Sequence, residues 1–343
     1  MNFQNNRYTL RFADSSDNEG IRKIFEDSTF DGGLSVQYLR SSLPYESFTA
    51  DGDCAKILVI IDNNADRTIA VGGAVIRSEY LNGTPEKCAY LTGLKIHPDY
   101  HNKISFIAKA YKFLYEEISD CKIFYSTILD DNKGAIALFE KKHRNMPEYR
   151  YLGHYTTYCF HGGKKFFALE KNNLDGFDKL LKSHFSKLSL TPVDYDCKGF
   201  GEKTFYSLRE NGKIIACCFA GNQQANKQYK MSSYGGVYKF LSKLPTQLFG
   251  FPKFPKADSV INHGVISYLY VKDNDKKLCK KFLRSVAKAS DFSLLIWGGF
   301  ENNPLCKALD GMKTVHYGSR LYSIVWDNSP DITGTIGVEA GLL

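Results

Sequence analysis

The order of predicted helices and strands in the first half of this sequence is repeated in its second half. In residues 1–162, hydrophobic periodicity predicts a strand, a helix, three strands, a helix, a strand, a short helix and a closing aromatic strand. Residues 163–343 repeat this order, which places residues 94–96 over 269–271 and Asn132 over Asn303. Because 343 residues exceed a typical single core, we predict two domains, 1–162 and 163–343.

Glycine and proline positions refine this prediction. Gly72 and Gly73 lie inside a predicted strand and indicate a β-bulge or a close backbone approach, whereas Asn211-Gly212 predicts a hairpin turn. The second copy also carries an insertion at 222–259, rich in aromatic residues, lysine and proline. We interpret the insertion as a lid or as packing between the domains, and packing is the simpler interpretation.

Composition excludes several classes of protein. No apolar run approaches the roughly 20 residues needed to cross a bilayer, and the N-terminus does not resemble a signal peptide. We therefore expect a cytoplasmic protein with no membrane partner. The nine cysteines are scattered without a C-x-x-C pair, so we expect neither a disulfide framework nor a metal site. The net charge of +8 permits an anionic cofactor or acidic partner, but no polybasic arm or nucleic-acid motif predicts nucleic-acid binding.

The stretch LTGLKIHPDYHNKISF, residues 91–106, predicts a strand, a polar break and a helix. A helix start has unpaired backbone N–H groups and a partial positive charge, so a strand that leads into it directs hydrogen-bond donors at any anion nearby. His101 and Lys103 would add positive charge there. An ordinary strand-to-helix loop is the alternative interpretation.

The repeated order, together with LKIHPDY at 94–100 and NKGAIALF at 132–139, resembles the GNAT superfamily of acyl-CoA-dependent N-acyltransferases, in a tandem form. The resemblance implies an α+β fold (an α/β mixed sheet) with two GNAT-like domains, each a mixed, mostly antiparallel sheet flanked by helices. It implies acetyl-CoA or another acyl-CoA as co-substrate and an amine as acceptor. The cofactor-binding residues that it implies are Leu94, Lys95, Ile96, His101, Asn102, Lys103, Ile104, Ser105, Phe106 and Asn132.

The first copy departs from the family's pattern where phosphate is expected to bind. His101 replaces the usual Arg or Gln, Ile104 the first glycine and Phe106 the last small residue. Phe139 stands where the family has a tyrosine that protonates the departing thiolate. Cβ atoms in such a turn hinder a close approach of phosphate, so the resemblance implies a weakened anion site.

The second copy departs further. Its loop at 272–277 has no glycine, and Asp310 follows the short helix where tyrosine is expected. We interpret the second domain as a structural or acceptor-side partner of the first.

The catalytic residues stay unassigned. Tyr125, His97 and Asp130 are polar candidates to reach the cleft, whereas Asp131 fits a helix cap better than a general base.

Three functions are compatible with these observations. The first is an acyl-CoA-dependent N-acyltransferase, acting as a monomer or dimer on an unidentified amine. The second is an inactive tandem-GNAT scaffold, favoured by the missing turn glycines and by Phe139. The third is a tandem transferase that uses a larger donor such as aminoacyl-tRNA.

Overall fold

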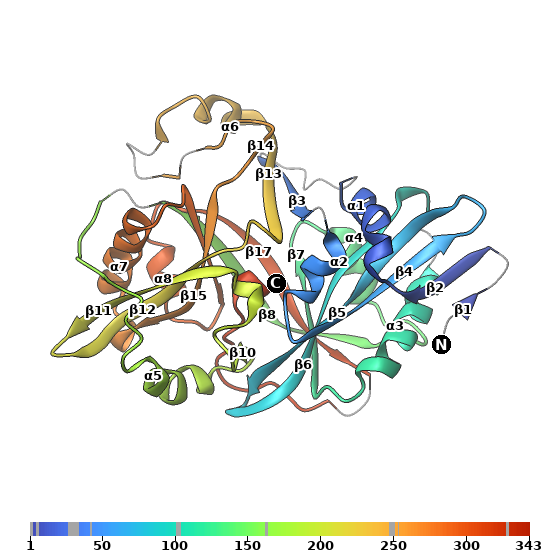
Figure 1. Cartoon of the computed structure of the whole chain (residues 1–343), viewed down its shortest axis with the longest axis horizontal. Coiled ribbons are helices and arrows are strands. Elements are labelled where there is room, and N and C mark those ends of the chain that lie inside the picture. The colour runs from blue at the N-terminus through green and yellow to red at the C-terminus, as the bar shows by residue number, and fades with distance from the viewer. Residues whose placement is uncertain are drawn as a thin grey trace.

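Figure 1 shows the computed structural model of the chain, in which residues 3–4, 7–26, 34–41, 43–100, 104–161, 164–246, 251–252, 254–326 and 329–343 are described. The first half contains β1 (Phe3–Gln4), β2 (Tyr8–Phe12), α1 (Asn18–Glu26), β3 (Leu34–Arg40), α2 (Pro44–Thr49), β4 (Cys54–Asp62), β5 (Arg67–Leu81), β6 (Thr84–Ile96), α3 (Ile104–Ile118), β7 (Ile123–Leu129), α4 (Lys133–Phe139) and β8 (Glu148–Phe160).

The second half contains β9 (Glu170–Lys171), α5 (Phe177–Ser183), β10 (Thr191–Pro192), β11 (Glu202–Glu210), β12 (Lys213–Asn222), β13 (Lys227–Tyr234), α6 (Gly236–Leu241), β14 (Ser259–Val260), β15 (His263–Val271), α7 (Lys276–Ala289), β16 (Leu294–Phe300), α8 (Cys306–Leu309), β17 (Val315–Val325) and the 3-10 turn η7 (Ala340–Leu342). None of the helices described is long and apolar enough to cross a membrane.

Helices cover both faces of the sheet in each half. In the first half, α1 and α2 pack on one face and α3 and α4 on the other, because strand residues alternate between the two faces. In the second half, α5 covers one face and α7 and α8 cover the other. Helix α7 begins where the Asp275 side chain accepts hydrogen bonds from two backbone N–H groups, and it buries Phe282 and Val286.

The two halves share one continuous sheet. The closing strand of each half pairs with the other half: β17 lies antiparallel to β7, and β8 lies antiparallel to β16. Strands β8 and β17 also pair with each other along their length at the centre of the molecule (Figure 1). The mixed sheets flanked by helices were expected, whereas the exchange of closing strands was not. The boundary at 162/163 stays a prediction.

Two short segments differ from the sequence-based expectation. The predicted strand at 164–171 is reduced to β9, because the backbone N–H groups of Phe166 and Phe167 donate to the Ser285 hydroxyl on α7 instead of to a sheet. Strand β3 was not expected, and it pairs with β13 of the insertion. The insertion therefore packs between the halves, as one of its two interpretations states.

Candidate functional site

Strands β6 and β7 separate soon after they meet. They are parallel and pair only at Cys88–Tyr90 with Ile123–Tyr125. Just beyond this pairing, the Ser126 hydroxyl donates to the Leu91 carbonyl at 2.8 Å. The separation leaves an opening in the sheet between the carboxyl ends of two neighbouring parallel strands, where open α/β sheets commonly bind ligands.

A β-bulge lies on β6 beside this opening. Val71 of β5 faces Lys95 and Gly73 faces Thr92, so Gly93 and Leu94 together oppose Gly72. Of the two alternatives predicted at Gly72-Gly73, the close backbone approach is borne out, because a Cβ on Gly73 would clash with the backbone of Lys56 and Ile57; the bulge itself lies on the neighbouring strand. Gly93 has a φ of 71°, and a Cβ there would lie 2.7 Å from the ring of Phe48. The bulge therefore needs glycine at this position.

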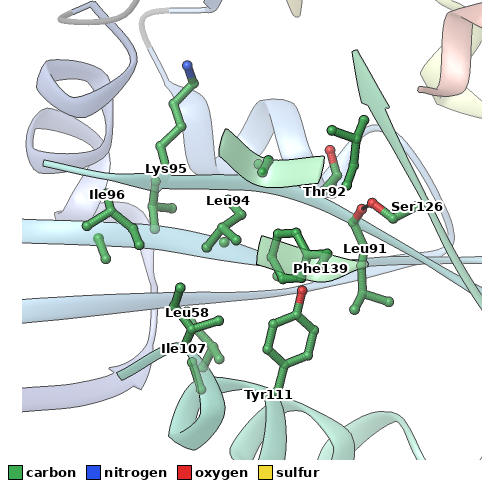
Figure 2. A pocket seen from close by; sticks show the side chains of 18 of the residues that line it. Leu58, Leu91, Thr92, Leu94, Lys95, Ile96, Ile107, Tyr111, Ser126 and Phe139 are labelled. Atoms are coloured by element: carbon green, nitrogen blue, oxygen red, sulfur yellow. Dashed lines mark hydrogen bonds between the residues drawn. The ribbon is translucent and has the colours of Figure 1, made fainter. Parts of the chain in front are cut away.

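A cavity of about 300 Å³ occupies the opening. Its wall includes side chains from both faces of the sheet, so the cavity passes through the sheet between β6 and β7. Figure 2 shows Leu58, Ile107 and Tyr111 on one side of the strands and the Lys95 side chain pointing to the other side. The lining on the α3 and α4 side includes Leu58, Ile60, Ile107, Ala110, Tyr111, Leu114, Asn132, Ala135, Phe139 and Tyr149; that on the α1 and α2 side includes Phe25, Tyr38, Arg40 and Leu343.

The polar groups of the cavity are few. On the α3 side, the Tyr111 and Tyr149 hydroxyls share a hydrogen bond, and the Phe139 ring stacks on Tyr149 at a centroid distance of 4.4 Å. Burial raises the pKa of Tyr111, so this hydroxyl keeps its proton at neutral pH. On the opposite side, burial lowers the pKa of Lys95 to about 8, and its ammonium lies 5.1 Å from the centre of the Phe25 ring.

Several predicted cofactor residues meet at this cavity: Leu94, Lys95, Ile96, Phe106 and Asn132 all line it. Asn132 also caps α4, where its side chain accepts from the Ala135 N–H at 3.1 Å. Helix α3 begins at Ile104, but the side chains of Ile104 and Ser105 lie outside the described part of the structure. His101, Asn102 and Lys103 also lie outside it.

The three catalytic candidates lie away from the cavity lining. The Tyr125 hydroxyl is fully buried, where it donates to Glu79 and accepts from Arg77, both at 2.7 Å. His97 accepts from the Asp99 N–H at 3.3 Å in the turn after β6, and Asp130 lies 2.6 Å from Nε2 of His154 on β8. Each of these side chains forms a hydrogen bond with a neighbouring residue, and none of them lines the cavity.

A buried charged cluster joins the halves at the α1 and α2 end of the cavity. Arg40 Nη1 donates to Asp51 Oδ2 at 2.6 Å, and the Lys227 ammonium lies 3.1 Å from Asp51 Oδ1. The Arg40 guanidinium stacks on the Phe48 ring at 3.8 Å, and its Nε has no hydrogen-bond partner among the described residues. Burial lowers the pKa of Lys227 to about 8 although Asp51 opposes the shift.

Arg40, Tyr38 and Tyr111 were missed by the sequence analysis. The first two belong to β3, which exists as a strand only because the insertion of the other half pairs with it. Tyr111 lies at helical spacing on the apolar face of α3, a pattern that indicates core packing. The one feature of the sequence that bears on this region is Phe139, which stands where the resemblance expects a tyrosine.

Comparison with known proteins identifies the fold. No protein-family model matches the sequence, and no curated protein is similar to it in sequence. Among solved structures, Saccharomyces cerevisiae N-myristoyltransferase with bound myristoyl-CoA aligns with a TM-score of 0.61 over 99% of this chain and 89% of that chain, at 10% identity. The chain has the GNAT fold.

Two solved structures of GCN5-related N-acetyltransferases support this assignment of the fold. The GCN5-related N-acetyltransferase from Sphaerobacter thermophilus aligns with a TM-score of 0.52 at 10% identity, over 96% of this chain and 99% of that chain. The one from Anabaena variabilis aligns with a TM-score of 0.50 at 11% identity, over 94% of this chain and 73% of that chain. The predicted resemblance is confirmed at the level of the fold.

The second half repeats the bulge of the first half, but its opening is closed. Strands β15 and β16 also pair over three residues only, and Tyr268 and Leu269 form a bulge at the positions of Gly93 and Leu94. Tyr268 has a φ of 49°, and its N–H donates to Glu339 at 2.8 Å. The C-terminal turn η7 packs on β15 and β16, so the chain's own residues occupy the place that the cavity has in the first half.

No group of three or more His, Cys, Asp or Glu side chains that could hold a metal ion occurs in the ranges that the structure describes.

Proposed function

We propose that the first half is the active half of an acyl-CoA-dependent N-acyltransferase. The observation that carries the proposal is the cavity that passes through the sheet at the β6–β7 opening, beside the bulge at Gly93-Leu94. It lies on the GNAT fold, and the N-myristoyltransferase of the same fold is solved with myristoyl-CoA. The second half, whose equivalent bulge is covered by Glu339, would act as its structural partner.

The donor would lie in the opening with its pantetheine along β6. Strand residues at Leu94, Lys95 and Ile96 would contact the pantetheine amides, and the start of α3 would face the pyrophosphate. The mostly apolar wall of the cavity suits an acyl chain. The cavity volume of about 300 Å³ also accommodates the pantetheine arm. Acetyl-CoA is the donor that we propose first, and a longer acyl-CoA belongs to the same proposal.

The acceptor would approach from the α1 and α2 side, where Tyr38 and Arg40 line the cavity. The neutral amine attacks the thioester carbonyl, so a C–N bond forms and the C–S bond breaks. The amine then loses a proton, and the coenzyme A thiolate takes one up. Because attack needs mainly positioning, this chemistry does not require a dedicated nucleophile on the protein.

Tyr111 is our proposed proton donor to the thiolate. Its ring lies 6.1 Å from that of Phe139, the residue that stands where the resemblance expects a tyrosine. Its pKa is raised by burial, so the hydroxyl is protonated over the physiological range, and Tyr149 can hold it in place through their shared hydrogen bond.

The test is release of the coenzyme A thiol from acetyl-, butyryl- and octanoyl-CoA in the presence of primary amines and peptides with free N-termini. We expect turnover with at least one pair, and Tyr111→Phe should lower kcat about 100-fold with little change in KM. Tyr115→Phe on the same helix is the control, because Tyr115 stacks on Trp326 outside the cavity lining.

Two results would contradict the proposal in different ways. Equal loss of kcat in Tyr111→Phe and Tyr115→Phe would show that Tyr111 is not the proton donor, while the proposed transferase activity would still stand. Absence of turnover with every donor and amine would favour the inactive scaffold, to which the non-glycine residues Ile104 and Phe106 already point.

A further inference from the structure

The insertion of the second half exposes large apolar side chains at its outer end. Val237 and Phe240 of α6 are each 65% exposed, and Leu244 and Phe251 follow with 40% and 38%. We call these four residues the insertion tip. Figure 1 shows that α6 lies at the top of the molecule, beyond the helices that cover the two halves. Soluble proteins rarely gather exposed aliphatic and aromatic residues on so short a segment without a binding role.

The exposure of the tip is not a by-product of poor packing. The opposite side of α6 packs against the insertion itself: the rings of Tyr238 and Tyr234 both contact Phe254, and the Tyr234 hydroxyl donates to the Pro255 carbonyl at 2.7 Å. The Thr246 hydroxyl likewise donates a hydrogen bond to the Pro252 carbonyl, also at 2.7 Å. The insertion thus has a small core of its own, and the tip residues are not needed to complete it.

Positive charge surrounds the tip. Lys239, Lys243 and Lys256 are exposed, and none of the ion pairs in the described ranges involves them. Asp258 is the sole acidic residue of the 222–259 insertion, and Lys230 pairs with it at 2.6 Å. The face therefore presents uncompensated ammonium groups next to apolar side chains.

We propose that the insertion tip binds the surface of an anionic lipid bilayer. Lysines beside exposed Phe, Leu and Val fit the interface of such a bilayer. The anionic headgroups attract the ammonium groups, and the apolar side chains are buried among the acyl chains. A stable protein partner usually needs some 20–30 residues on each side, which is far more than this tip offers. Surface binding of this kind needs no membrane-spanning helix, and it does not depend on the proposed transferase activity.

Co-sedimentation of the full chain with vesicles tests the proposal. We expect binding to vesicles of phosphatidylcholine with 30% phosphatidylserine, and little binding to pure phosphatidylcholine. The double variant Val237→Ser/Phe240→Ser should weaken binding at least about tenfold because it removes apolar insertion. Lys239→Gln/Lys243→Gln should weaken it about 25-fold, at about fivefold per lysine, and added salt should weaken the wild type.

Matched variants of Leu174 and of two lysines on α5 serve as controls. Leu174→Ser and Lys179→Gln/Lys182→Gln change an exposed apolar residue and exposed lysines elsewhere on the second half, and they should bind vesicles like the wild type. Thermal unfolding should show that every variant is folded. Absence of binding to the anionic vesicles, equal binding to both vesicle types, or equal binding by the tip variants and the control variants would each overturn the proposal. A dimer in sedimentation velocity that Val237→Ser/Phe240→Ser dissolves would also overturn it, because the tip would then bind a second copy.

Discussion

Replacement of Gly93 by alanine should lower acyl-CoA turnover about 100-fold and destabilise the fold by about 3 kcal/mol. The φ of 71° strains any residue with a Cβ, at a cost of about 1–2 kcal/mol. The new Cβ would also lie 2.7 Å from the fully buried Phe48 ring, and overpacking of this kind adds about 1–3 kcal/mol. Because Arg40 stacks on Phe48, a shift of the ring would move the acceptor end of the cavity, where small misplacements cost large factors in rate.

Gly83→Ala is the matched control for this variant. Gly83 has a φ of 91° in the β5–β6 turn, but a Cβ there has no neighbour within 4 Å. Gly83→Ala should therefore cause the same kind of backbone strain without a steric clash, and its turnover should stay close to that of the wild type. Urea unfolding and initial rates would be measured on both variants. If Gly93→Ala loses no more activity than Gly83→Ala, the bulge has no part in donor or acceptor binding.

Replacement of Glu339 by glutamine should remove a pH dependence of stability that amounts to several kcal/mol. Glu339 is buried beside Tyr268, and burial raises its pKa from 4.5 to about 8 in the folded chain. Between pH 4.5 and about 8, Glu339 therefore keeps its proton in the folded state, whereas in the unfolded state it has released it. The stability that Glu339 contributes is fully present below pH 4.5 and is lost as the pH rises through 8. Glutamine can still accept the hydrogen bond from Tyr268, but it does not titrate.

The difference in unfolding free energy between wild type and Glu339→Gln should fall by about 1.4 kcal/mol for each pH unit within this window. Urea unfolding at half-unit steps of pH measures it. Val338→Ala is the control, because it changes the same buried segment without a titratable group, so its difference from wild type should stay constant. A flat difference for Glu339→Gln would mean that the carboxyl is not held protonated over the Tyr268 bulge.

Local features of the fold could be predicted where a single residue determines the backbone. Asn211 and Gly212 both have positive φ, of 50° and 74°, and form the predicted hairpin turn. The predicted short helix after β7 begins at Lys133, with Asn132 rather than Asp131 as its cap, and Gly72 marks the place where β5 faces the bulge of β6. In each case the information is contained within a few neighbouring residues, so periodicity and turn chemistry suffice to find it.

Features that depend on distant partners could not be predicted. The closing strands β8 and β17 carry the same aromatic alternation, so the sequence does not specify which half each one completes. The same is true of Glu339, which lies 71 residues from its partner Tyr268. Arg40 and Lys227 come from different halves, face each other where β3 pairs with β13, and share Asp51. A buried charged cluster of this kind has no local sequence signature.

Several further expectations from the sequence stay predictions. They include the pyrophosphate contacts at His101, Asn102 and Lys103, the domain boundary at 162/163, the cytoplasmic location and the oligomeric state.

Calorimetric titration of acetyl-CoA and free coenzyme A into the purified chain measures donor binding at the β6–β7 opening. We expect one site per chain with micromolar affinity. Ala110→Trp, which places an indole in the cavity wall on α3, should abolish binding, whereas Ala137→Trp on the exposed side of α4 should not affect it. Absence of heat at millimolar cofactor, or equal binding by Ala110→Trp and wild type, would contradict a coenzyme A site at the β6–β7 opening.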